Sequence, residues 1–208
     1  MIITYYGLTC FKLQSGETVA AFDPFSKESG LTPPRFQTHI ALVTKPESPY
    51  HNNTEALTVT NLVITTPGEY ETCGIVVEGA AANGSIIYTL EWEGLRICHL
   101  GAVGLETLPD TVRESIGIPD ILFVPVGNGG ALDAEAAATI VNQLEPRIVI
   151  PTYYKFSGLR SPSLEQPDAF LKEFGEYEKL DEKFTIKKKD VPQEKTMFVL
   201  LRPLAEKK

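Results

Sequence analysis

Halfway along the chain the spacing of the apolar residues changes, and this change restricts the fold more than any other feature. In the first half, short segments rich in β-branched and aromatic residues alternate with turns that contain glycine. This pattern predicts mainly antiparallel strands, because such turns join neighbouring strands directly. The expected strands are residues 2–7, 10–13, 18–23, 61–65, 73–80, 86–92 and 95–100, and residues 38–53 begin as a further apolar strand that runs into a polar loop.

The second half instead combines near-continuous apolar runs with helical periodicity. Residues 120–126 and 147–151 have the composition of strands buried on both faces. Residues 133–144 predict a helix, because Asp133 can cap its start and an apolar stripe follows at helical spacing. Two shorter helices and two late strands complete the expected elements: 109–116, 166–174, 184–188 and 196–201. We therefore expect one domain, 1–208, with two sheets and helices on their outer faces.

Charge and composition exclude several classes of partner. The chain has 208 residues, a formal net charge of −8 and a pI near 5.0, so its field repels phosphate backbones and anionic membrane surfaces. No apolar run approaches the ~18 residues of a membrane span, and the first residues lack the basic and apolar regions of a secretion signal. Cys10, Cys73 and Cys98 lie far apart, as expected of reduced thiols. We predict a cytoplasmic protein that binds neither nucleic acid nor membrane.

Several short phrases along the chain carry a family resemblance. They are Ile-Thr-Tyr-Tyr-Gly-Leu-Thr-Cys-Phe at 3–11, Phe-Asp-Pro-Phe at 22–25, Pro-Gly-Glu-Tyr-Glu at 67–71, Ile-Cys-His-Leu-Gly at 97–101 and Arg-Ile-Val-Ile-Pro at 147–151. In this order they resemble the metallo-β-lactamase superfamily, in the branch related to ascorbate-6-phosphate lactonase. The resemblance implies an α+β fold, the four-layer αβ/βα sandwich with two mixed, mostly antiparallel sheets and helices on the outer faces. It also implies a centre that holds two zinc or iron ions at the ends of strands.

The superfamily motif Thr-His-x-His-x-Asp-His, which carries most of the metal ligands, is degenerate here. Counted from the strand at residue 38, its ligand positions fall on Lys45, Glu47, Pro49 and Tyr50. If the loop has one extra residue, His51 takes the last position instead, and the sequence leaves this alternative open. Zinc needs about three or four N, S or O donors at once, and at most one nitrogen donor remains in this segment.

The other positions implied by the resemblance are altered as well. The bridging aspartate falls on Ala102, the final histidine on Tyr153, and a histidine common near the start of the branch on Leu8. For His39 and His99 a structural or surface role is expected. The sequence therefore predicts no catalytic residue and no metal ligand at these positions.

A rebuilt metal site is a weaker alternative. Asp23, Glu47 and His51 could together hold a hard ion such as magnesium or manganese. The simpler interpretation is that Asp23 binds the backbone of a loop and Glu47 is solvated. Zinc or manganese is expected as a cofactor only if the rebuilt site exists.

The functional hypotheses follow from this choice. The first is a protein that keeps the fold, has lost its metal centre and binds a small molecule or a protein partner in a residual cleft. That cleft would be lined by Leu8, Lys45, Tyr50, Tyr153 and Tyr154. The second is a metal-dependent hydrolase of small phosphorylated or lactone substrates, and the third a subunit that pairs with an active paralogue or with itself. The sequence identifies no ligand, partner or oligomeric state, and it leaves open whether the chain is an enzyme.

Overall fold

The first sheet is built mainly from the amino-terminal part of the chain. The computed structural model describes residues 1–160 and 164–205. In spatial order, the six-stranded sheet contains β13 (Lys183–Thr185), β1 (Ile2–Gly7), β2 (Cys10–Ser15), β3 (Thr18–Phe22), β4 (Gln37–Leu42) and β5 (Thr58–Ile64). Strands β1, β2 and β3 form an antiparallel meander, whereas β3, β4 and β5 run parallel because long loops carry the chain back between them.

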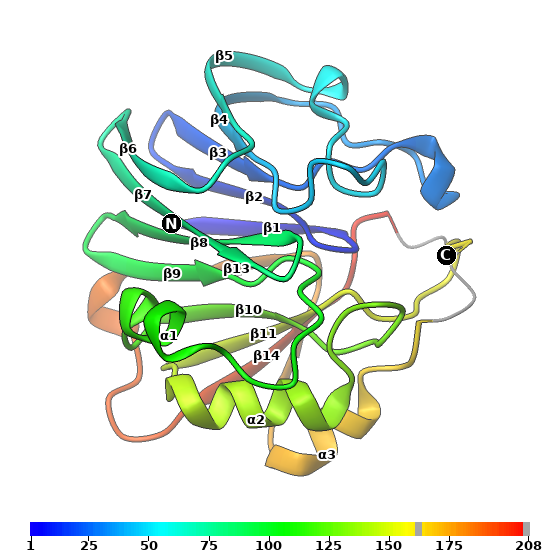
Figure 1. Ribbon diagram of the computed structural model, residues 1–208, viewed down its shortest axis with the longest axis vertical. Coiled ribbons are helices and arrows are strands. Elements are labelled where there is room, and N and C mark those ends of the chain that lie inside the picture. The colour runs from blue at the N-terminus through cyan, green and yellow to red at the C-terminus, as the bar shows by residue number, and fades with distance from the viewer. Residues whose placement is uncertain (161–163, 206–208) are drawn as a thin grey trace.

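The second sheet has eight strands and faces the first (Figure 1). In spatial order it contains β12 (Glu178–Leu180), β14 (Met197–Leu201), β11 (Ile148–Thr152), β10 (Ile121–Pro125), β9 (Leu95–His99), β8 (Ser85–Trp92), β7 (Ile75–Ala82) and β6 (Gly68–Thr72). Strands β6 to β9 are an antiparallel meander, and β9, β10, β11, β14 and β12 are parallel. The turn between β8 and β9 is Glu93-Gly94, where both residues have positive φ, as a two-residue hairpin requires.

Three α-helices pack on the outer side of the eight-stranded sheet (Figure 1). They are α1 (Asp110–Ile116), α2 (Ala134–Leu144) and α3 (Asp168–Phe174). The side chain of Asp133 caps α2 by accepting a hydrogen bond of 2.9 Å from the Ala136 N–H. The apolar stripe of α2, including Ile140 and Leu144, is buried. Within the described residues, no helix combines the length and apolar character that a membrane span requires.

The outer side of the six-stranded sheet has a thinner covering. A small cluster of Ala21, Ala41 and Leu57 packs there against Phe36 and Val59. Two short 3-10 turns, η1 (Lys27–Ser29) and η2 (Thr54–Ala56), lie in the loops that return the chain to this sheet. Loops rather than long helices therefore shield this face.

The predicted α+β sandwich of two mixed sheets is confirmed, with differences in detail. Parallel strand pairings are as common as antiparallel ones in the described chain, so the sheets are less antiparallel than expected. Residues 67–71, where no strand was expected, mostly form β6, and the strand expected at 184–188 ends at Thr185 before a 3-10 turn, η3 (Lys188–Asp190). Strand β12 was not predicted, because Glu178-Lys179-Leu180 has no apolar alternation.

Aromatic side chains fill the space between the sheets. Phe11 from β2 lies 4.3 Å from Phe123 of β10 and stacks on Tyr5 at 4.6 Å, measured between ring centroids. His99, the last residue of β9, packs edge-on against Phe22 at 4.5 Å. This packing positions the ends of β3, β4 and β9 close together.

Candidate functional site

Asp23 joins the turn after β3 to the end of β4. Its Oδ1 accepts a hydrogen bond of 2.7 Å from the Thr44 N–H, and its Oδ2 accepts one of 2.7 Å from Thr44 Oγ1. The side chain is fully buried, and this burial raises the pKa of Asp23 to about 7, although the hydrogen bonds from Thr44 act in the opposite direction. Both carboxyl oxygens are therefore engaged by the protein itself, as the simpler interpretation of Asp23 expected.

His99 connects the two sheets beside Asp23. Its Nδ1 accepts a hydrogen bond of 3.0 Å from the Gly101 N–H, so the proton of the neutral ring lies on Nε2, which donates to the Thr9 carbonyl at 2.8 Å. Burial lowers the pKa of His99 to about 4. Its Nε2 lies 3.8 Å from Asp23 Oδ2, but a neutral ring makes no ion pair there. The structural role expected for His99 agrees with these two bonds.

His51 is buried at the same end of the sheets, only 1% exposed. Its Nδ1 lies 3.0 Å from Ser48 Oγ, and its Nε2 finds no hydrogen-bond partner among the residues that the structure describes. Burial, followed by the charges of Lys45 and His99, lowers the pKa of His51 to about 3. The side chain therefore stays neutral and offers one free nitrogen.

Leu8, Tyr50 and Tyr153 close the space where the residual cleft was expected. Together with Ser29 and Leu159 they surround a cavity of about 10 Å³. Ligand pockets commonly measure about 300–1,000 Å³, whereas a single water needs about 10–15 Å³. These side chains therefore leave room for no more than one water.

The remaining predicted residues do not all meet at this cavity. Tyr154 turns into the core, where its hydroxyl donates to the Leu201 carbonyl at 2.6 Å and its ring lies 6.0 Å from that of Tyr5. Glu47 is exposed, Lys45 is half-buried and Ala102 is buried. Tyr154 therefore lies apart from the cavity that Tyr50 and Tyr153 border.

The available donors do not fit a metal ion. Across residues 1–160 and 164–205, no group of three or more His, Cys, Asp or Glu side chains could hold one. Both ring nitrogens of His99 and both carboxyl oxygens of Asp23 make internal hydrogen bonds, whereas His51 Nε2 has no hydrogen-bond partner among the described residues. One imidazole is fewer ligands than a zinc, magnesium or manganese site requires.

The backbone at the site is strained in a way that the sequence did not reveal. Leu8, Asp23 and Tyr153 all have left-handed backbone, with φ of 54°, 43° and 51°. This conformation costs non-glycine residues roughly 1–2 kcal/mol each and tends to cluster at functional sites. Asn, Asp and Gly are the residues that usually indicate left-handed backbone in a sequence, so Leu8 and Tyr153 gave no such indication. Thr44, which holds Asp23, was also missed as a site residue.

Comparison with known proteins places this geometry in a family. A family model described as a beta-lactamase superfamily domain matches residues 2–153. A UPF0173 metal-dependent hydrolase from Methanosphaera stadtmanae is 41% identical over 85 residues, which cover 40% of this chain and 36% of that protein. One from Thermococcus onnurineus is 28% identical over 89 residues, or 43% of this chain and 38% of its own length. The matched regions thus span little more than a third of these relatives.

Solved structures extend the likeness to nearly the whole chain. A protein of the metallo-β-lactamase superfamily from Thermotoga maritima superposes with a TM-score of 0.83 at 28% identity, covering 97% of this chain and 100% of that one. Igni18, a metallo hydrolase from Ignicoccus hospitalis, has a TM-score of 0.62 at 15% identity, covering 83% and 89%, and this likeness concerns the fold alone. The chain belongs to the β-lactamase superfamily and has the metallo-β-lactamase fold.

Proposed function

We propose that this protein keeps the metallo-β-lactamase fold but has lost its metal centre and, with it, hydrolytic activity. The observation that carries the proposal is that the polar groups at the site make hydrogen bonds within the protein. Asp23 is bonded twice to Thr44, and both ring nitrogens of His99 are bonded to backbone groups. In metal-dependent hydrolases the ion lowers the pKa of a bound water to about 7 and polarises the scissile bond. The groups present here supply neither effect.

The apolar and aromatic residues at the site support the same proposal, because they leave no space for a substrate. Leu8, Tyr50 and Tyr153 border a cavity of about 10 Å³, so a substrate would find no space beside His51. Of the two ligand classes expected from the sequence, a protein partner on the outer surface fits this closed site better than a small molecule inside it. The left-handed backbone at Leu8, Asp23 and Tyr153 fits a scaffold that once presented ligands at these turns.

The alternative is a metal-dependent hydrolase with a rebuilt site. The names of the relatives from Methanosphaera stadtmanae and Thermococcus onnurineus favour it. Such a site would have to use Asp23, Glu47 and His51, with zinc or manganese as the cofactor. It would require Asp23 to give up its bonds to Thr44 and the exposed Glu47 to move inward.

Elemental analysis distinguishes the two functions. The protein is purified without chelator, and portions are incubated with zinc, manganese or iron before free ions are removed. A working site retains its ion tightly. Because the proposal is that the centre is lost, we expect less than about a tenth of an ion per chain in every portion. Phosphoester and lactone assays on the same portions should show no turnover above buffer.

Two substitutions make this result specific to the site. His51→Ala removes the one free nitrogen, and Glu47→Ala removes the exposed carboxylate. Both variants should have the same metal content as the unmodified protein. Near-stoichiometric metal that disappears in either variant would overturn the loss of the centre and favour the rebuilt site.

A further inference from the structure

A second pocket, separate from the closed cavity, lies between α3 and the strands β12 and β14. Its volume is about 220 Å³, slightly below the roughly 300–1,000 Å³ of common ligand pockets, so it has room for a small molecule. The described residues that line it all fall between Tyr154 and Pro203, whereas the family model matches residues 2–153. The pocket therefore belongs to a part of the chain that the family model does not describe.

Apolar and aromatic side chains form the body of this pocket. Phe156 and Leu171 are buried in its wall, and Tyr177 keeps 44% of its surface exposed. Aromatic rings of a protein bury a large apolar area and pack against other rings in offset or edge-on contacts. This lining suits a ligand that has an aromatic or apolar body.

Three cationic side chains line the same pocket. They belong to Lys155, Lys179 and Arg202. Arg202 makes ion pairs of 3.2 Å with both Asp181 and Glu182. Among residues 1–160 and 164–205, by contrast, no carboxylate forms an ion pair with the ammonium group of Lys155 or of Lys179. Both lysines are therefore free to contact an anion.

Negative charge is largely kept out of the pocket. Side chains alternate along β12, so Lys179 lines this pocket, whereas Glu178 lines a separate hollow together with Glu176. Asp168 contributes one negative charge to the described lining, against three positive ones. The whole chain carries a net charge of −8, but at physiological ionic strength charges act over only ~8 Å. The positive charges at the pocket therefore decide which ligand it attracts.

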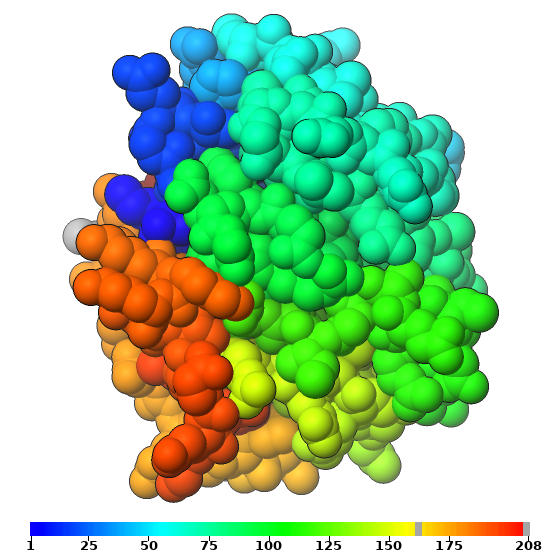
Figure 2. Space-filling model, turned by 90° about the vertical axis from the view of Figure 1, so that its left-hand side faces the viewer, coloured from blue at the N-terminus to red at the C-terminus, as the bar shows by residue number. Residues whose placement is uncertain are grey.

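The two free lysines are accessible, and their backbone is held in place. The Lys155 N–H donates to the Glu165 carbonyl at 2.8 Å, and Lys179 lies opposite Leu200 in the parallel pairing of β12 with β14. Both side chains are exposed, and the orange atoms in Figure 2 show the segment around β12 and β13 on the outer surface of the molecule. Groups that are already positioned lose less conformational freedom when a ligand binds.

We propose that this pocket binds a small organic anion. Its head group, a carboxylate or a phosphate, contacts Lys155 and Lys179, and its aromatic or apolar body lies against Tyr177. Hydrogen bonds between an ammonium group and an anionic oxygen are charge-assisted and stronger than those between neutral groups. The proposal does not depend on the state of the metal centre, because none of the residues assigned to the family's ligand positions lines this pocket.

Titration of the full chain with four ligands that share one ring tests the proposal. Benzoate and phenyl phosphate are anions, benzyl alcohol is neutral and benzylamine is a cation. Amide resonances in NMR spectra follow the binding, with each ligand added up to roughly 20 mM. We expect the tighter anion to bind with a dissociation constant of about 1 mM or lower, at least about tenfold below that of benzyl alcohol. Whichever anion binds more tightly identifies the head group.

Three lysine variants connect this binding to the pocket. Lys155→Met and Lys179→Met each remove one charge and keep most of the side-chain length. Each should weaken the binding of the tighter anion by about threefold to tenfold, because one charge-assisted contact is lost. Lys172→Met is the matched control, since Lys172 is an exposed lysine on α3 that lies outside the described lining. Its affinity should equal that of the unmodified protein.

The resonances that shift show where the anion binds. They should centre on Phe156, Leu171 and Tyr177, and thermal unfolding shows that the variants remain folded. The proposal would be overturned if neither anion bound saturably or if benzyl alcohol or benzylamine bound as tightly as the anions. Equal affinities of the three lysine variants, or shifts centred elsewhere in the protein, would overturn it as well.

Discussion

At the scale of single residues, His51 and His99 are side chains whose protonation the fold resists. Burial lowers their pKa values from 6.5 to about 3 and about 4. Above pH 6.5 each histidine is neutral in both the folded and the unfolded chain. Below pH 6.5 the unfolded chain takes up a proton that the folded protein resists, so the protein loses stability until the pH reaches the folded-state pKa. Asp23 acts in the opposite sense, because its pKa rises from 3.8 to about 7 and its burial becomes costly as the pH increases over that range. The two histidines lower the unfolding free energy as the pH falls from 6.5 to 4, whereas Asp23 alone raises it, so stability should decline over this range.

The variant His51→Leu isolates one of these protons. Between pH 6.5 and 4 it should flatten the dependence of the unfolding free energy on pH by about 1.4 kcal/mol per pH unit, since one fewer proton is bound on unfolding. Urea unfolding at a series of pH values measures this slope. At pH 8, where the imidazole is neutral in both states, the variant serves as its own control for packing. An unchanged slope would mean that His51 is protonated in the folded protein.

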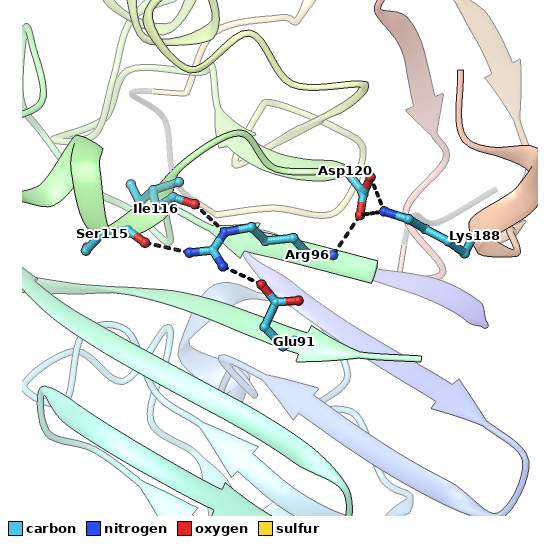
Figure 3. A network of polar contacts seen from close by, with 6 residues as sticks. All are labelled: Glu91, Arg96, Ser115, Ile116, Asp120 and Lys188. Atoms are coloured by element: carbon cyan, nitrogen blue, oxygen red, sulfur yellow. Dashed lines mark hydrogen bonds and ion pairs between the residues drawn. The ribbon is translucent and has the colours of Figure 1, made fainter. Parts of the chain in front are cut away.

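At the scale of elements, Arg96 on β9 fastens α1 to the second sheet (Figure 3). Its Nε donates to the Ile116 carbonyl at 2.5 Å and its Nη2 to the Ser115 carbonyl at 2.6 Å, while its Nη1 pairs with Glu91. The last carbonyls of a helix lack partners within the helix, so the guanidinium caps this end of α1.

The same residue lies in a wider network. The Arg96 N–H donates to Asp120 Oδ2 at 2.8 Å, and the Lys188 ammonium contacts both oxygens of Asp120 at 2.9 and 2.7 Å (Figure 3). These bonds join β9, the start of β10 and the 3-10 turn η3. Lys188 thus has a structural partner in Asp120.

Removal of the Arg96 guanidinium should destabilise the protein. Arg96→Met leaves two helix carbonyls without their donors, so we expect the unfolding free energy to fall by about 1–3 kcal/mol. Arg113→Met is the control on α1 itself, because the exposed ion pair between Arg113 and Asp110 should contribute less than about 1 kcal/mol. Urea unfolding compares the two, and equal losses would contradict the capping role of Arg96.

At the scale of the whole molecule, side chains from distant parts of the chain hold the two sheets together. Phe11 of β2 packs against Phe123 of β10, and His99 at the end of β9 binds the Thr9 carbonyl next to β2.

The sequence by itself determined the features that depend on neighbours in the chain. Asp133 and the apolar stripe behind it predicted α2, and the apolar runs at 120–126 and 147–151 predicted β10 and β11, because helix caps and side-chain periodicity act over a few residues. From Lys45, Ala102 and Tyr153 the sequence also predicts, without coordinates, that the family's ligands are missing.

Only the tertiary structure decided what happens where distant segments meet. His99 binds Thr9 across 90 positions of the chain, and Asp23 binds Thr44, since each bond depends on how the sheets pack. The closure of the cavity by Tyr153 and the burial of Tyr154 in the core arise in the same way. No local pattern encodes them, because strand order and side-chain direction are set by contacts between segments that the sequence keeps far apart.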